Sequence, residues 1–199
     1  MRKSEHTELA TLSRLAVLAS TDGLSNITYG SAAIAAHLSK GAMQRLFPDK
    51  AALQSTVLAH AVKLMHAHIF EYDHIESVRF ATTRARWAGW ISGDAGLPGG
   101  CVLLATAAGR GNSMELQQGV SAALECLGDT LSALATQENL IQPTDIARFK
   151  RQQLAAALEL HVAQFILPRP NIQNQSALTA NSEAHNQRKS EFARWHRQY

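Results

Sequence analysis

Hydrophobic residues recur at helical spacing along most of the chain. In the first segment an apolar stripe is formed by Leu9, Leu12, Ala16 and Ala19. No segment alternates apolar and polar residues with enrichment of β-branched side chains, and the 199 residues include only five prolines. This pattern predicts an all-α fold.

Capping and turn residues divide the first 50 residues into short elements. We expect the first helix to end at Gly23, since glycine adopts the left-handed conformation that closes many helices. Thr28 and Ser39 are expected to cap helices over 29–36 and 40–46, because their hydroxyls can accept hydrogen bonds from first-turn amides. The connection between these helices is so short that they must cross steeply. This layout is typical of a helix-turn-helix motif, whose second helix enters the major groove of DNA.

The rest of the pattern consists of longer helical segments. They are predicted over 50–70, which Asp49 would cap, and over 75–91, 101–108, 114–137 and 144–167. Residues 101–108 are apolar on all sides, so we expect them to be buried. The helices over 114–137 and 144–167 are long enough to pair with their symmetry mates in a homodimer. Residues 170–184 read as a polar linker, followed by a short basic helix.

The second short helix carries residues suited to reading DNA. Its long donors and acceptors, which match the edges of guanine and adenine, are Lys40, Gln44 and Arg45. Its small residues, which allow close approach to a groove, are Gly41 and Ala42. The N-termini of both short helices offer backbone amides to phosphates. The same geometry also occurs in proteins that bind no DNA, so the pattern alone leaves that alternative open.

An ordered set of residues spans the two short helices and the start of the next. It runs from Gly23-Leu24 and Ile27-Thr28 through Ala32-Ala33, Ala36 and Leu38-Ser39-Lys40-Gly41-Ala42-Met43 to Phe47-Pro48-Asp49-Lys50 and Leu53. This set resembles the N-terminal domain of TetR-family transcriptional regulators over about residues 8–60. Further on, Leu97-Pro98-Gly99-Gly100-Cys101-Val102-Leu103 is similar to a Pro-Gly-Gly-Cys segment in one branch of that family.

The resemblance implies a homodimeric repressor of a double-stranded DNA operator. A three-helix DNA-binding head would occupy residues 1–49, a larger helical domain for ligand binding and dimerisation residues 50–169, and a polar linker with a basic tail residues 170–199. Thr28 and Lys50 would contact phosphates. A small-molecule effector would release the repressor by changing the separation of the two heads. The alternative is a helical small-molecule-binding or interaction protein whose head does not read DNA specifically.

Three positions depart from the family pattern. His37 stands where glycine is usual, and it can adopt a positive φ only at some cost. Gln44 stands where a tyrosine is common, and Ala32 replaces a larger aliphatic residue, which would loosen the small core. We expect these differences to shift the operator preference, and the alternative is a head with weakened DNA affinity.

Aromatic side chains in the second half of the chain are candidates to line an apolar effector pocket. With Arg84 as a polar anchor, the candidates are Phe80, Trp87, Trp90, Cys101 and Met114. The alternative is that the tryptophans fill the core, as large side chains at helical spacing commonly do.

Charge is unevenly distributed, although the formal net charge is only +3. Residues 1–60 hold six basic and four acidic side chains, and residues 168–199 hold five and two. Positive ends around a slightly acidic middle indicate an anionic partner. The predicted motif gives the N-terminal charge a role, because Lys40, Arg45 and Lys50 fall where bases and phosphates would lie.

Other classes of function find little support. Two cysteines cannot form a disulfide framework, and no apolar run approaches the ~18 residues of a membrane span. None of the histidines His60, His66, His68 and His74 is spaced i, i+4, so we expect neither a metal nor a cofactor. Catalytic motifs and a secretory pattern at the N-terminus are absent from the sequence. We therefore expect a cytoplasmic protein that is not an enzyme and contacts no membrane.

Overall fold

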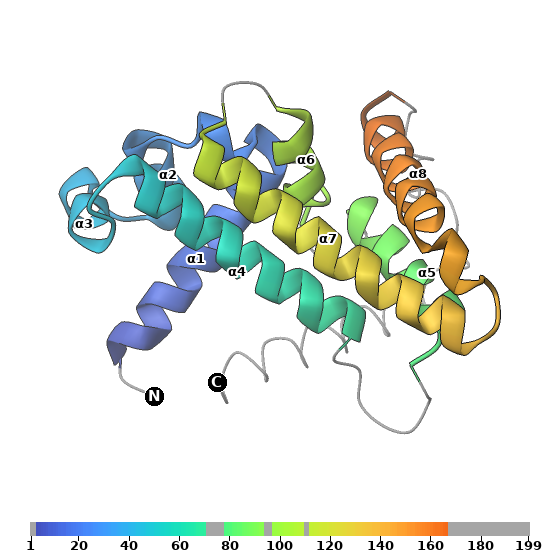
Figure 1. Cartoon of the computed structure of the whole chain (residues 1–199). Helices are drawn as coiled ribbons and strands as arrows, with labels where there is room; N and C mark the ends of the chain where they lie inside the picture. Colours follow the sequence, from blue (N-terminus) through green and yellow to red (C-terminus); the bar gives the residue numbers. More distant parts are fainter. Residues whose placement is uncertain (1–2, 71–77, 94–96, 110–111, 167–199) are drawn as a thin grey trace, which may run out of the picture.

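The structure, a computed structural model, describes residues 3–70, 78–93, 97–109 and 112–166. Within these ranges the chain is helical and contains no β-strand, which confirms the predicted all-α fold (Figure 1). Its elements are α1 (Lys3–Asp22), η1 (Leu24–Asn26), α2 (Tyr29–Ala36), α3 (Lys40–Leu46), α4 (Lys50–Phe70), α5 (Phe80–Ile91), α6 (Val102–Ala108), α7 (Met114–Gln137), η2 (Pro143–Asp145) and α8 (Ile146–Ile166). The predicted linker and basic helix lie outside the described residues.

Most helix boundaries agree with the sequence prediction, and those of α2, α3, α4 and α7 coincide with it. Helix α5 is an exception, because Val78 and Arg79 are not helical and the helix begins at Phe80. The backbone amide of Phe80 donates to Oε1 of Glu138, at the end of α7, over 2.6 Å. A carboxylate from a distant helix thus takes the place of the missing local cap, and no pattern near residue 75 reveals it.

Residues 3–49, here named the head, pack around one small apolar core. Helices α1, α2 and α3 contribute side chains that are almost fully buried, among them Leu15, Ala19, Ala32 and Met43. Helix α1 also lies against the first half of α4, so the head joins the rest of the molecule along two helices. Figure 1 shows α3 at one end of the molecule, where none of the other described helices lies against its outer side.

Residues 50–166, here named the larger region, form a second helical layer. The long helices α4 and α7 run side by side, and α5, α6 and α8 pack around them (Figure 1). Helix α6 is buried over Val102–Leu104 and at Thr106, but Ala107 and Ala108 are exposed. The prediction that the whole segment 101–108 is buried is therefore wrong for its last turn, which leads into the exposed Gly109. Among the described helices, none has both the length and the apolar composition needed to cross a membrane.

Candidate nucleic-acid interface

Two hydroxyl side chains fix the starts of the short helices, as predicted. Thr28 Oγ1 accepts from the amide of Ser31 over 3.1 Å, and Ser31 Oγ accepts in return from the amide of Thr28 over 2.9 Å. Ser39 Oγ accepts from the amide of Ala42 over 3.1 Å. These bonds set the direction of α2 and α3, and the other first-turn amides have no acceptor inside their own helix.

The turn between α2 and α3 is tight and left-handed at His37. This residue has φ 56° and ψ 42°, so the backbone adopts a positive φ at the position where the family usually has glycine. Its amide donates to Ile34 O over 3.1 Å, and the amide of Leu38 donates to Ala33 O over 2.9 Å. Arg14 of α1 donates to the carbonyl of Ala36 over 2.9 Å. The end of α2 is therefore closed by a Schellman arrangement and held from α1.

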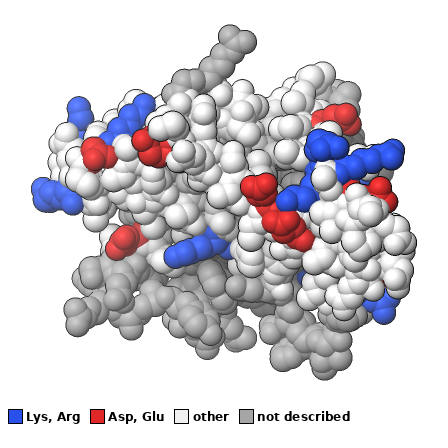
Figure 2. All heavy atoms as spheres, viewed as in Figure 1, with Lys and Arg blue, Asp and Glu red and all other residues white. Residues whose placement is uncertain are grey.

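Helix α3 presents the predicted reading residues to solvent. Lys40, Gly41, Gln44 and Arg45 are exposed and Ala42 is half-buried, whereas Met43 is fully buried in the head. Figure 2 shows Lys and Arg side chains at this end of the molecule, with acidic side chains beside them. The helix is thus held on its inner side by one apolar residue and offers donors and acceptors on its outer side.

The start of α4 is tied to the head by two side chains one turn apart. Lys50 Nζ donates to Ser25 O over 2.9 Å, and the buried Gln54 donates through Nε2 to Leu24 O over 2.8 Å. The exposed ammonium of Lys50 carries three protons, so it retains donors for a phosphate. Asp49 Oδ1 accepts from the amide of Ala52 over 2.7 Å, as its predicted capping role requires.

Sequence reasoning missed two residues that hold this interface. The hydroxyl of Tyr29 donates to Phe47 O over 2.8 Å and so links the start of α2 to the end of α3. Gln54 is the other. One sequence feature could have revealed it. Gln54 lies on the apolar side of α4, one turn after Lys50, and a buried side-chain amide needs a hydrogen-bond partner.

Five of the six proposed pocket residues form a buried group and an exposed group. Trp87, Trp90 and Cys101 are buried, and the side chain of Trp90 hydrogen-bonds to the Cys101 sulfur. Burial raises the pKa of that thiol to about 11, so it is protonated at neutral pH and unsuited to redox sensing. Arg84 is exposed, and Met114 is 67% exposed at the first residue of α7.

Phe80 lies far from Met114. Its amide is bonded to Glu138, which directly follows the last residue of α7, and Met114 begins that 24-residue helix. The two positions are therefore ~36 Å apart along α7. The ring of Phe80 instead packs against Phe149, with centroids 5.5 Å apart. The structure does not bring all six proposed pocket residues to one site.

Two buried polar atoms on α5 have no hydrogen-bond partner among the described residues. They are Thr83 Oγ1 and Trp87 Nε1, which lie one turn apart on the same helix face. Buried polar groups are normally bonded. Both atoms could therefore form a further hydrogen bond, as could Asn112 Oδ1 and Gln164 Oε1, which are buried and unpaired among the described residues as well.

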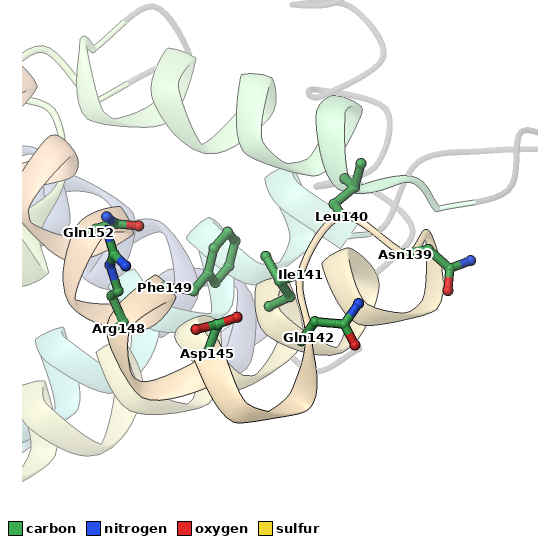
Figure 3. A pocket seen from close by; sticks show the side chains of 8 residues that line it. All are labelled: Asn139, Leu140, Ile141, Gln142, Asp145, Arg148, Phe149 and Gln152. Carbon is green, nitrogen blue, oxygen red and sulfur yellow. The ribbon is translucent and has the colours of Figure 1, made fainter.

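A separate hollow of about 310 Å³ opens at the corner between α7 and α8 (Figure 3). Figure 3 shows its lining residues, which are Asn139, Leu140, Ile141, Gln142, Asp145, Arg148, Phe149 and Gln152. Sequence reasoning did not predict it. None of the six proposed pocket residues lines this hollow, although Phe80 touches Phe149 at its edge.

The histidines near the end of α4 serve separate contacts. His60 Nε2 lies 3.2 Å from Ser13 Oγ of α1, and His66 packs against Phe70. His68 stacks on Trp90, and burial together with the nearby Arg86 guanidinium lowers its pKa. His74 lies outside the described residues. Within the described ranges, no three His, Cys, Asp or Glu side chains are grouped as metal ligands.

Comparison with protein-family models and with curated protein sequences finds no match to this chain.

Proposed function

We propose that this chain is a DNA-binding transcriptional regulator of the TetR type, a dimeric repressor that a small-molecule effector releases from its operator. The observation that carries the proposal is the outer face of α3. On it Lys40, Gln44 and Arg45 are all exposed, on a helix capped by Ser39. These side chains match the hydrogen-bonding edges of guanine and adenine in the major groove.

The rigidity of the head supports this proposal. Met43 and Phe47 are buried, and Tyr29 donates to the carbonyl of Phe47. Helix α3 is therefore held at its middle and at its C-terminal end. A reading helix has to keep its side chains in fixed register with base edges, because geometry decides which base is bound. We infer that α2 and α3 act as a helix-turn-helix motif, with α3 in the major groove.

Charge and helix ends around α3 support contacts to phosphates. Residues 23–50 hold three basic side chains and a single acidic one. Thr28 is exposed at the start of α2 and Lys50 at the start of α4, on either side of α3 in the sequence. Phosphate contacts of this kind fix the register of a protein on DNA, while base contacts supply the specificity.

Dimerisation is proposed from the surface of α8. Its last turns expose three large apolar side chains, Val162, Phe165 (62% exposed) and Ile166 (71% exposed). A contiguous apolar surface of this kind marks an interaction site in a soluble protein. Pairing of α7 and α8 with their symmetry mates would cover these residues. A symmetric dimer would supply two α3 helices, as recognition of two half-sites ~34 Å apart requires.

The effector is proposed to bind near the polar atoms of α5 that lack partners. Thr83 and Trp87 would hydrogen-bond to it, with Trp90 as an apolar wall. A ligand alters DNA affinity only if it binds one arrangement of the dimer better than the other.

Selection of bound sequences from a random double-stranded DNA library tests this function. We expect enrichment of a two-fold symmetric site, bound with a Kd of about 10⁻⁸ M or below and with an affinity that falls steeply as salt rises. Weak association that enriches no sequence would contradict the proposal and favour the helical interaction protein with a head that does not read DNA.

A further inference from the structure

The turn formed by Gly99 and Gly100 lies buried between the head and the larger region. A side-chain carbon on Gly99 would overlap the backbone carbonyl of Ser20, in the last turn of α1. The Gly99 amide also donates to Ser20 Oγ over 3.1 Å, and both residues are buried. Only glycine can come this close, so the loop before α6 is in direct backbone contact with the head.

The same turn is held from the opposite side by α5 and α8. Gly100 has φ +76°, and a side-chain carbon there would overlap the carbonyl of Ile91, the last residue of α5. The carbonyl of Gly99 accepts from Gln164 Nε2 of α8 over 3.4 Å. That nitrogen also lies 2.8 Å from Nδ1 of the buried His161. A continuous series of contacts therefore runs from α8 through Gly99 to Ser20 of the head.

Ser20 is suited to hold this contact. Its hydroxyl donates to Val17 O over 2.8 Å and accepts from Gly99, so the proton and one lone pair are both used. The residue is 1% exposed, so water cannot replace either bond. Removal of the hydroxyl would leave the buried amide of Gly99 without its acceptor.

We propose that the Gly99–Gly100 turn is a positioning contact through which α5 and α8 help to set the orientation of the head, in addition to the packing of α1 along α4. A movement of α5 or α8 displaces Gly99, and α1 must follow because no space separates the two backbones. Tightly packed contacts of this kind transmit small shifts as rigid-body rotations instead of absorbing them. The role of such a rotation in releasing DNA rests on the proposed function, whereas the mechanical coupling itself does not.

The coupling can be measured as a distance between spin labels within one chain. One label is placed on the exposed native Cys126 of α7 and the other on α1 through Glu8→Cys, also at an exposed position. Cys101 is fully buried, so it does not take up label. Labelled chains are mixed with an excess of unlabelled protein, so that pulsed electron resonance reports distances within single chains.

We expect Ser20→Ala and Gln164→Ala each to shift and broaden the distance distribution relative to the labelled parent. The matched control is Ser132→Ala, at a serine of α7 that is 2% exposed and donates to Gly128 O of its own helix. It should leave the distribution unchanged. Circular dichroism establishes that each variant is folded. If Ser20→Ala fails to fold, Gln164→Ala at a half-buried position decides alone.

Distributions identical to the parent in both test variants would overturn the proposal. The readout involves no DNA, so this failure would leave the proposed DNA binding untouched. Conversely, a protein that selects no DNA sequence can still show the coupling.

Discussion

The head and the larger region differ in what they leave exposed and what they leave unpaired. On the head, α3 exposes the polar side chains Lys40, Gln44 and Arg45 above a small core with closed helix ends, although Leu46 of α3 and Ile34 of α2 are also exposed. In the larger region, α8 exposes large apolar side chains, and α5 holds buried polar atoms without partners among the described residues. The head thus presents side chains that can bind a polar surface without rearrangement. The larger region therefore leaves the apolar side chains and the polar atoms to which we propose that a second copy of the chain and a ligand bind.

The largest effect is expected where the two regions meet. Gly99→Ala would force a methyl group into the backbone of Ser20, so it should lower the free energy of unfolding by about 2–4 kcal/mol. Gly89→Ala is the control, because within the described residues no atom outside the surrounding α5 backbone lies within 4 Å of an added carbon. The control should be neutral or stabilising, by up to ~1 kcal/mol. Urea unfolding measures both, and a Gly99 variant as stable as the parent would contradict the close contact.

A second prediction concerns the oligomeric state, which should depend on the apolar end of α8 and not on the head. Phe165→Glu places a charge on the exposed apolar end of α8 and should shift the dimer toward monomer, with the dissociation constant raised at least about tenfold. Ile34→Glu is the matched control, since Ile34 is an apolar side chain of α2 that is 79% exposed. Sedimentation equilibrium should show the control as dimeric as the parent. Equal dissociation constants for both variants would place the dimer contact elsewhere.

A smaller effect is expected at Gly41 of α3, where a substitution should lower DNA affinity without destabilising the fold. In Gly41→Ala the nearest described atom outside the backbone of α3 is Arg45 Nη1, 3.9 Å from the added carbon, so the fold should be unchanged or slightly more stable. If α3 lies in the major groove, the methyl group takes up space against the DNA, and affinity should fall about tenfold, or ~1.4 kcal/mol. Fluorescence anisotropy with the selected site measures this. An unchanged affinity would mean that Gly41 does not approach DNA.

The smallest effect concerns the turn of the head. His37 adopts the left-handed conformation that glycine tolerates without strain, so His37→Gly should raise the free energy of unfolding by about 0.5–1 kcal/mol. Thermal unfolding of the purified variant checks the sign. A loss of stability would show that the imidazole makes a contact worth more than the backbone strain.

The comparison also explains how far sequence reasoning reaches. In the head, the signals are local: Thr28, Ser39 and Asp49 each cap the helix that directly follows them, and His37 closes the one before it. Such contacts join residues a few positions apart, so spacing predicts them. The outer face of α3 could be predicted for the same reason.

In the larger region, the deciding contacts join distant residues. The start of α5 depends on Glu138, 58 positions away, and the burial of Gly99 depends on Ser20, 79 positions away. Helical spacing indicates that these aromatic residues line the core or a pocket. It does not predict which other helix they pack against. The pattern therefore groups Phe80 with Met114, although the two residues lie near opposite ends of α7.

The central claim is that α3 reads DNA, and one measurement tests it most directly. Lys40→Ala with Arg45→Ala is compared with Lys63→Ala, which removes an exposed charge of α4 ~20 Å along the helix from Lys50. On the selected site, the double variant should lose about hundredfold in affinity, since each base contact is worth ~1–3 kcal/mol. Its unfolding curve should match the parent, and Lys63→Ala should bind nearly as the parent does. A double variant that binds the selected site as tightly as the control would contradict the claim.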